Sequence, residues 1–273
     1  MNILIIGKPR SRTTYLGKSI SSYYNTRYLS EPYDSAGYMH NHYYRLKMIK
    51  SNNYESLLYQ KQEEWLYGVT KNIFEINNCV AKIFPRHLTV DISGLENYKL
   101  HDNYDSRWDS FTDPNNFKFK LFTNLSEILQ LKKFDKLFFI ERNLIDSPIS
   151  FAYSMRINHF VFNSHQNIDQ VKRKFSQIVL DEKDIPFINY VVYEHVLLEK
   201  IKAFIAENYP CVFLTYDNVT DYIETNFKVN LKNNLINPKF NYKEIIKNYT
   251  EIEKYINQVY KIFCPKLENI IFT

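Results

Sequence analysis

The first stretch with residue types suited to binding chemistry is GKPRSRTT, residues 7–14. It joins an apolar run to a segment with a helical pattern. A loop between a strand and a helix presents unpaired backbone N–H groups and the positive end of the helix dipole. The stretch therefore predicts an anion-binding loop with phosphate as its typical ligand. The residues expected to hold the anion are Gly7, Pro9, Arg10, Ser11, Arg12, Thr13 and Thr14.

The same stretch departs from the Walker A loop of nucleoside triphosphatases. In that pattern a glycine is followed, after four residues, by Gly-Lys and then Ser or Thr. Gly7 has the right place, but Arg12 and Thr13 stand where Gly-Lys is required. Without that lysine, phosphoryl transfer loses a charge clamp on the terminal phosphates. The sequence disfavours a plain ATPase and leaves an ordinary basic turn as the simple alternative.

A second cation follows another apolar run, KLFFIE. Arg142 comes directly after this run, and Ser150 comes eight residues later. A cation at the carboxyl end of a central strand and a hydroxyl near a helix start would form a second anion site. Pro148 is expected at the first helical position, capped by Asp146 or Ser147. The alternative is an unrelated strand-end arginine and helix serine.

Two further residues have types suited to catalysis. Glu31 lies in YLSEPYD, 21 residues beyond Arg10, and is expected on the same sheet edge as the loop. Lys82 is a charge inside the apolar run CVAKIF, where a buried ammonium needs an anionic partner. A carboxylate can act as a base and a lysine as electrophilic support. The alternatives are a strand-end carboxylate or helix cap for Glu31, and a lysine extending to solvent for Lys82.

Strands that end at one edge of a parallel sheet would position these residues. Alternating strand and helix patterns predict βαβ units. The expected strands are 2–6, 27–30, 79–84, 136–141 and 211–216, and the expected helices are 13–24, 54–77, 125–133, 149–160 and 186–207. The prediction is an α/β fold of the three-layer α/β/α kind with a central parallel sheet.

The chain is predicted to form a single domain over residues 1–273, because no internal repeat and no linker rich in Gly, Ser or Pro divides it. Segment 89–124 has little periodicity and several turn signals, which indicates an excursion over one sheet edge. Such loops often cover ligands. Segment 218–273 has the pattern of a helical C-terminal part.

Charge and composition disfavour several classes of protein. The net charge of +5 is spread without a long basic run, so no nucleic-acid groove is expected. Three widely spaced cysteines argue against a disulfide framework and a zinc site, and we expect no metal and a reducing, cytoplasmic location. The N-terminal apolar run, about five residues long, is too short for a signal peptide or a membrane span, so no membrane partner is expected.

Together the motifs resemble those of the sulfotransferase family. The 5′-phosphosulfate loop of its bacterial and tyrosylprotein branches reads Pro-Arg-Ser-Gly-Thr-Thr, and residues 9–14 read PRSRTT, with Arg12 in the glycine position. LFFIERNLIDSPIS resembles the family's 3′-phosphate signature through Arg142 and Ser150. CVFLTYDNV resembles a family strand ending in Tyr-Glu-Asp-Leu, which is mainly a structural corner.

A fourth motif, NPKFNYKEIIKNYTEI, resembles the C-terminal segment in which a lysine closes over the nucleotide in some members. Lys239 is the nearest equivalent, and Lys232 and Lys243 compete with it. The motifs serve as anchor points over most of the chain.

The resemblance implies a P-loop-type fold and transfer of a sulfuryl group from 3′-phosphoadenylyl sulfate (PAPS) to a hydroxyl of a sugar, small alcohol or tyrosyl peptide. It implies Glu31 as the base, with Lys82 and Arg10 supporting the leaving group. The cytosolic branch uses a histidine where this chain has Phe84, which leaves His87 as a competing base. A P-loop nucleotide or small-molecule kinase, and a catalytically silent nucleotide-binding protein of the same fold, remain alternatives.

Overall fold

The computed structural model describes residues 1–34, 54–91, 111–156, 178–227 and 241–273. Five parallel strands form the central sheet in the order β2-β3-β1-β6-β7. They are β1 (Asn2–Gly7), β2 (Arg27–Leu29), β3 (Cys79–Ile83), β6 (Lys136–Glu141) and β7 (Cys211–Thr215). The five predicted strands are confirmed, each to within one residue at either end, because each is a short run of β-prone residues bounded by polar or turn residues.

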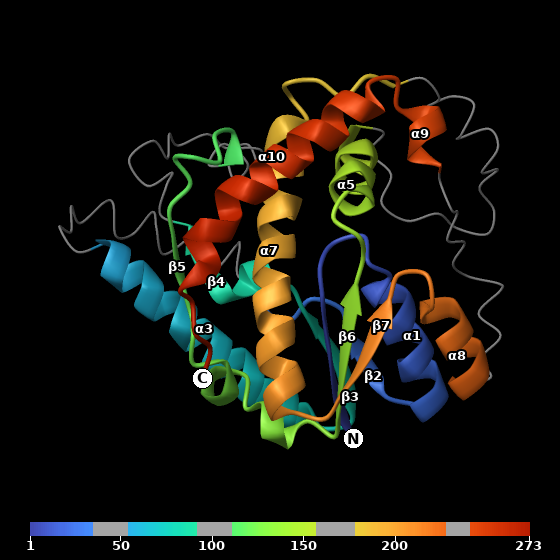
Figure 1. The fold of residues 1–273 in the computed structure, drawn as a ribbon. Coiled ribbons are helices and arrows are strands. Elements are labelled where there is room, and N and C mark those ends of the chain that lie inside the picture. The colour runs from blue at the N-terminus through green and yellow to red at the C-terminus, as the bar shows by residue number, and fades with distance from the viewer. Residues whose placement is uncertain (35–53, 92–110, 157–177, 228–240) are drawn as a thin grey trace.

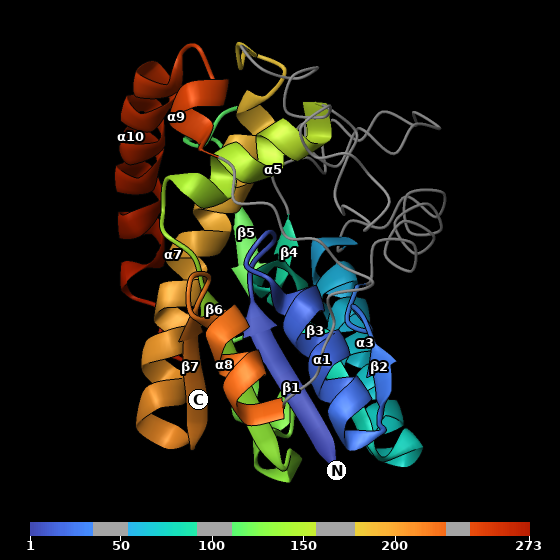
Figure 2. The ribbon, with the colours of Figure 1, turned by 90° about the vertical axis from the view of Figure 1, so that its right-hand side faces the viewer.

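Helices cover both faces of this sheet (Figures 1 and 2). The longer ones are α1 (Thr13–Tyr24), α3 (Tyr54–Ile76), α5 (Asp146–Arg156), α7 (Ile185–Asn208), α8 (Val219–Phe227) and α10 (Tyr249–Glu268). In Figure 1, α3 and α7 lie on one side of the strands and α1 and α8 on the other. The predicted α/β class with a central parallel sheet is confirmed, and the arrangement is compatible with a three-layer α/β/α fold.

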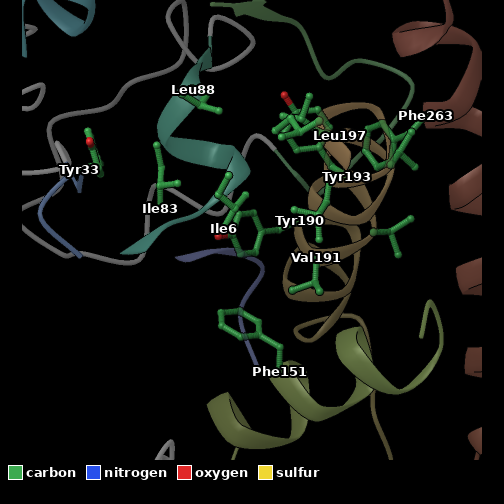
Figure 3. Close-up of a cluster of buried hydrophobic side chains, with 14 of the residues drawn as sticks. Ile6, Tyr33, Ile83, Leu88, Phe151, Tyr190, Val191, Tyr193, Leu197 and Phe263 are labelled. Atoms are coloured by element: carbon green, nitrogen blue, oxygen red, sulfur yellow. The ribbon is translucent and has the colours of Figure 1, made fainter. Parts of the chain in front are cut away.

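The alternation of side chains along β1 explains the two helical layers. Ile3 and Ile5 face α1 and α8, where they pack in one apolar cluster. Leu4 and Ile6 face α3 and α7, in a larger cluster that also contains residues of α10. Figure 3 shows part of the larger cluster, with Ile6 and Tyr190 between β1 and α7. Every residue of β1 is buried.

The structure corrects the helix predicted over residues 125–133. Two shorter elements replace it, α4 (Leu125–Ile128) and the 3₁₀ turn η3 (Leu131–Lys133). Gln130 takes a left-handed φ of 48° between them, a conformation that an α-helix does not accommodate.

The start of α5 also differs from the prediction. Pro148 is the third helical residue and not the first, so neither Asp146 nor Ser147 caps the helix. The side chain of Asn143 accepts a hydrogen bond from the backbone N–H of Asp146 at 2.6 Å and so satisfies a helix-start donor one turn earlier. The predicted helix extended to residue 160, and residues 157–160 lie outside the described residues.

The described part of segment 89–124 packs against α7. β4 (Thr89–Asp91) and β5 (Phe119–Leu121) form a separate antiparallel pair, and Phe111 and Phe117 contact Tyr193 of α7. The described parts of segment 218–273 are mainly helical, as predicted, and include the short α9 (Tyr242–Ile245). No helix among the residues that the structure describes has the length and hydropathy needed to cross a membrane.

The strand order places a topological switch point at β1. The chain passes from β1 to β2 and β3 on one side, and later to β6 and β7 on the other. Connections therefore diverge above the carboxyl end of β1, which is where open α/β sheets bind ligands. In Figure 1 the strands point upward toward α5 and the loop after β1.

Candidate functional site

The loop after β1 leaves the sheet through Gly7. A Cβ atom at this position would lie 2.6 Å from the side chain of Thr13 and 3.1 Å from the carbonyl oxygen of Ile140, so only glycine fits this approach. Arg10 and Arg12 take left-handed backbone conformations, with φ of 65° and 66°. Arg12 is the N-cap of α1, and it adopts the conformation that a glycine accepts without cost.

Two guanidiniums gather on one aromatic ring beside this loop. Those of Arg12 and Arg142 lie 4.0 and 4.1 Å from the ring centroid of Tyr216, which follows β7. Arg12 donates hydrogen bonds to the carbonyl oxygen of Tyr216 at 2.8 Å and to Thr220 at 3.0 Å. Arg142 donates to the carbonyl oxygen of Arg10 at 2.9 Å. The side chain of Arg12 thus ties the loop to the β7–α8 connection.

These two arginines carry buried charge without a carboxylate partner among the described residues. Arg142 is 8% exposed and Arg12 is 9% exposed. The Nε atom of each is buried, and within the described residues neither Nε has a hydrogen-bond partner. Both are donors, so they suit an anionic ligand.

Ser150 joins the loop to α5 and to the C-terminal segment. Its hydroxyl accepts a hydrogen bond from Arg10 Nε at 3.3 Å and one from the Tyr242 hydroxyl at 2.8 Å. Ser147 donates to the carbonyl oxygen of Pro9 at 3.2 Å. Desolvation, and secondarily Arg142, lower the pKa of the Arg10 guanidinium. The structure therefore brings Arg10, Arg142 and Ser150 together at the ends of β1 and β6.

Glu31 and Lys82 form an ion pair at the other side of the loop. Lys82 Nζ lies 3.0 Å from Glu31 Oε1 and donates to the Thr14 hydroxyl at 2.9 Å. Lys82 is paired with Ile5 in the β1–β3 register, so both side chains point to the α1 face, where Thr14 begins the helix. Burial lowers the pKa of Lys82, and Glu31 opposes this change.

The second oxygen of Glu31 is bound by Arg86, which sequence reasoning missed. Arg86 belongs to the 3₁₀ turn η1 (Pro85–Leu88), and its guanidinium lies 2.9 Å from Glu31 Oε2. The guanidinium also contacts the Tyr190 hydroxyl, and the Arg86 backbone N–H donates to Glu194 Oε1 at 3.0 Å. Tyr190 and Glu194 lie on α7. The signal in the sequence that could have indicated Arg86 is a second cation four residues after Lys82, in AKIFPRHL.

A further buried basic residue, Lys8, lies in the loop and contacts α7. Its ammonium contacts Nδ1 of His195 on α7, and His195 in turn lies 3.4 Å from Glu199. Burial, and secondarily Arg142, lower the pKa of Lys8 to about 7. The lysine in GKPR was its only sequence signal, and its partner lies 187 positions away.

The remaining predicted residues are placed as follows. Nδ1 of His87 accepts the backbone N–H of Phe84 at 3.1 Å, and the ring is buried. Burial lowers the pKa of His87 well below its usual range, and Arg86 and Lys82 lower it further. The Nε2 atom of this ring is buried as well. Lys239 and Lys232 lie outside the described residues, whereas Lys243 is exposed and lies over the ring of Tyr249.

Comparisons of the chain with models of known protein families, with curated proteins and with solved structures find no match. The interpretation of the site therefore depends on its own residues.

Proposed function

We propose that the chain is a sulfotransferase of the P-loop type, which transfers a sulfuryl group from PAPS to a hydroxyl acceptor. The observation that carries this proposal is the pair of buried guanidiniums, Arg12 and Arg142, without a carboxylate partner among the described residues. Buried charge is costly unless it is paired. An anion above the ends of β1 and β6 would supply the missing partner.

The two ends of one doubly phosphorylated adenosine account for the two groups of donors. The first turn of α1, with the hydroxyls of Thr13 and Thr14, suits the 5′ phosphosulfate. Arg142 and Ser150 suit the 3′-phosphate, and Arg10, which donates to Ser150 at 3.3 Å, lies between the two groups. Tyr242, in the C-terminal segment, donates a hydrogen bond to Ser150 and so lies beside the proposed 3′-phosphate position.

Glu31 and Lys82 have the chemistry that sulfuryl transfer requires. Glu31 accepts the proton of the acceptor hydroxyl, whose oxygen forms a bond to sulfur as the bond from sulfur to the phosphate oxygen breaks. The electron pair of the broken bond stays on that phosphate, where Lys82 and Arg10 stabilise the charge. PAPS itself supplies the activated sulfuryl group.

One observation favours a second candidate, a nucleotide-binding protein without turnover. Both oxygens of Glu31 are already bound by cations, Lys82 on one and Arg86 on the other. The two cations limit the directions from which an acceptor hydroxyl can approach the carboxylate, although each oxygen keeps a second lone pair. A kinase is less favoured, because the Gly-Lys of the Walker A loop is replaced by Arg12-Thr13.

Binding of adenosine 3′,5′-bisphosphate tests the anion site. We expect the ligand to raise the melting temperature without metal, and ATP with magnesium to have little effect. Arg142→Met is expected to weaken binding about 10- to 100-fold, since it removes a charge-assisted contact to phosphate. Arg156→Met is the matched control, because Arg156 also lies on the C-terminal side of β6 but is paired with Asp181 and Asp184. Equal affinity of both variants would remove the basis of the proposal.

Turnover separates the transferase from the silent protein. Sulfuryl transfer from PAPS is measured over a panel of sugar, alcohol and tyrosyl-peptide acceptors. Glu31→Gln is expected to lower kcat about 100- to 10,000-fold and to leave the affinity for the bisphosphate within about twofold of wild type. Bisphosphate binding without transfer to any acceptor would favour the silent protein.

A further inference from the structure

The carboxylate of Glu31 is bound by two cations that are held in different ways. Lys82 reaches Oε1 from the sheet at 3.0 Å and also donates to Thr14 at the start of α1. Arg86 reaches Oε2 at 2.9 Å from the opposite side of the sheet end, where η1 contacts α7. A base needs a fixed orientation, and supporting residues usually provide it.

Arg86 is fixed to α7 at two points. Its guanidinium contacts the Tyr190 hydroxyl, and its backbone N–H donates to Glu194 Oε1 at 3.0 Å. The Tyr190 hydroxyl donates to the same carboxylate oxygen at 3.0 Å, which closes the group of three residues. Figure 3 shows Tyr190 on the side of α7 that faces Ile6 at the end of β1. Arg86 therefore joins the base to a rigid helix of the larger core.

Glu194 is a fully buried carboxylate, whose desolvation costs free energy. It is 0% exposed, and its Oε2 atom has no hydrogen-bond partner among the described residues. Burial raises the pKa of Glu194 to about 7, and Arg86 opposes this change. A buried carboxylate is costly unless a cation faces it. Its placement is explained if its role is to hold Arg86.

We propose that Arg86 is a positioning residue for the proposed transfer, anchored by Tyr190 and Glu194, which fixes Glu31 through Oε2 and leaves Oε1 to the acceptor hydroxyl. Lys82 is the cation that turns from Oε1 to the leaving phosphate, because it already lies between Glu31 and the anion loop. This inference rests on the proposed function through the role of Glu31 as the base. The proposed movement of Lys82 also opens Oε1, which Lys82 contacts in the structure.

Kinetics of Arg86→Met test this role. We expect kcat to fall about 10- to 100-fold, because a loosened base is misoriented for proton transfer. The acceptor KM and the Kd for adenosine 3′,5′-bisphosphate are expected to stay within about twofold of wild type. Guanidinium added in the millimolar range should restore part of kcat in Arg86→Ala. Lys71→Met, which removes a lysine from an exposed pair with Glu75 on α3, is the control.

Two results would overturn the inference. One is a wild-type kcat in folded Arg86→Met, and the other is a parallel loss of bisphosphate binding, which would make the role of Arg86 merely structural. If Arg86→Met does not fold, Tyr190→Phe carries the test, since it keeps the ring and removes the hydroxyl that contacts both Arg86 and Glu194. We expect a fall in kcat of about 3- to 10-fold for Tyr190→Phe, and an unchanged kcat contradicts the inference.

A second measurement does not depend on turnover. Crystal structures of the wild type and of Arg86→Met are compared at Glu31, whose carboxylate is expected to leave the position beside Lys82 in the variant. An unchanged carboxylate overturns the inference whatever the activity. Failure of the wild type to transfer a sulfuryl group counts against the proposed function alone.

Discussion

Lys8 illustrates how a single residue in the loop after β1 takes a role that its neighbours do not share. Arg10 donates to Ser150 on α5 and Arg12 to Thr220 on α8. Lys8, in contrast, is 0% exposed and contacts His195 on α7. Its ammonium has no ion-pair partner within the described parts of the chain, and burial without such a partner favours the neutral amine. The residue therefore makes stability depend on pH.

Lys8→Met is expected to stabilise the protein most at or below neutral pH. The pKa of Lys8 is about 7 in the fold and 10.5 as the ordinary value, so between these limits the unfolded chain binds more protons. Wild-type stability from this residue then rises with pH from about 7 to 10.5, and the cost of burying a charged Lys8 is largest below pH 7. We expect the variant to gain on the order of a few kcal/mol at pH 7, and much less at pH 10. Urea denaturation at both values measures the difference.

The exposed Lys71 provides the control for this experiment. Lys71→Met should change the free energy of unfolding by less than about 0.5 kcal/mol at either pH. Equal gains for Lys8→Met at pH 7 and pH 10 would show that the lysine is charged in the fold, against the expectation.

Among the elements, α7 contacts the candidate site and also two other parts of the described molecule. One face of the helix carries Tyr190 and Glu194 toward η1, and His195 meets the loop after β1. Another face carries Asn189, which is fully buried. Asn189 donates to the carbonyl oxygen of Phe111 at 2.7 Å and accepts from the Tyr255 hydroxyl at 2.9 Å. This one side chain therefore joins α7 to segment 111–122 and to α10.

Asn189→Leu is expected to destabilise the fold by about 2–4 kcal/mol. The leucine has a similar size, but it leaves the Phe111 carbonyl buried without its partner and removes the acceptor of the half-buried Tyr255 hydroxyl. The free energy of unfolding is measured in urea. Asn208→Leu is the control on the same helix, since Asn208 is exposed and donates to the Phe204 carbonyl oxygen within α7, and its effect should stay under about 1 kcal/mol. A loss below about 1 kcal/mol for Asn189→Leu would contradict this account.

For the molecule as a whole, the larger apolar cluster joins the sheet, α3, α7 and α10. Phe263 of α10 is fully buried and lies 5.5 Å from the ring of Tyr193 and 6.0 Å from that of Phe117. The described part of the C-terminal segment therefore shares a core with the sheet. A shared core favours the single domain that the sequence predicts.

Phe263→Ala is expected to lower the stability of the whole molecule by about 3–5 kcal/mol, because it opens a cavity in the shared core. We expect one cooperative transition, with coincident curves from far-ultraviolet circular dichroism and from tryptophan fluorescence, which includes Trp65 on α3. Separate melting of α10 with an unchanged main transition would show that the C-terminal part is a distinct unit.

The sequence by itself determined the sheet and the positions of the strand ends. The strands are short local runs of β-prone residues, so Arg142 after β6 and the loop after β1 could be located before any contact was known. The pairing of Glu31 with Lys82 was within reach for the same reason, since both lie at strand ends on one edge. Helix boundaries were harder to predict from the sequence. The start of α5 depends on the side chain of Asn143, and the break after α4 depends on the left-handed backbone of Gln130.

Only the tertiary structure decided which distant side chains meet. Arg12 reaches Thr220, Ser150 meets Tyr242, and Arg86 reaches Tyr190, each across a separation of more than 90 positions. No local pattern encodes such contacts, because they follow from how helices pack on a twisted sheet and from which polar groups must be satisfied there. The residue types at the site can therefore be read along the chain, whereas their partners become known only from the packing.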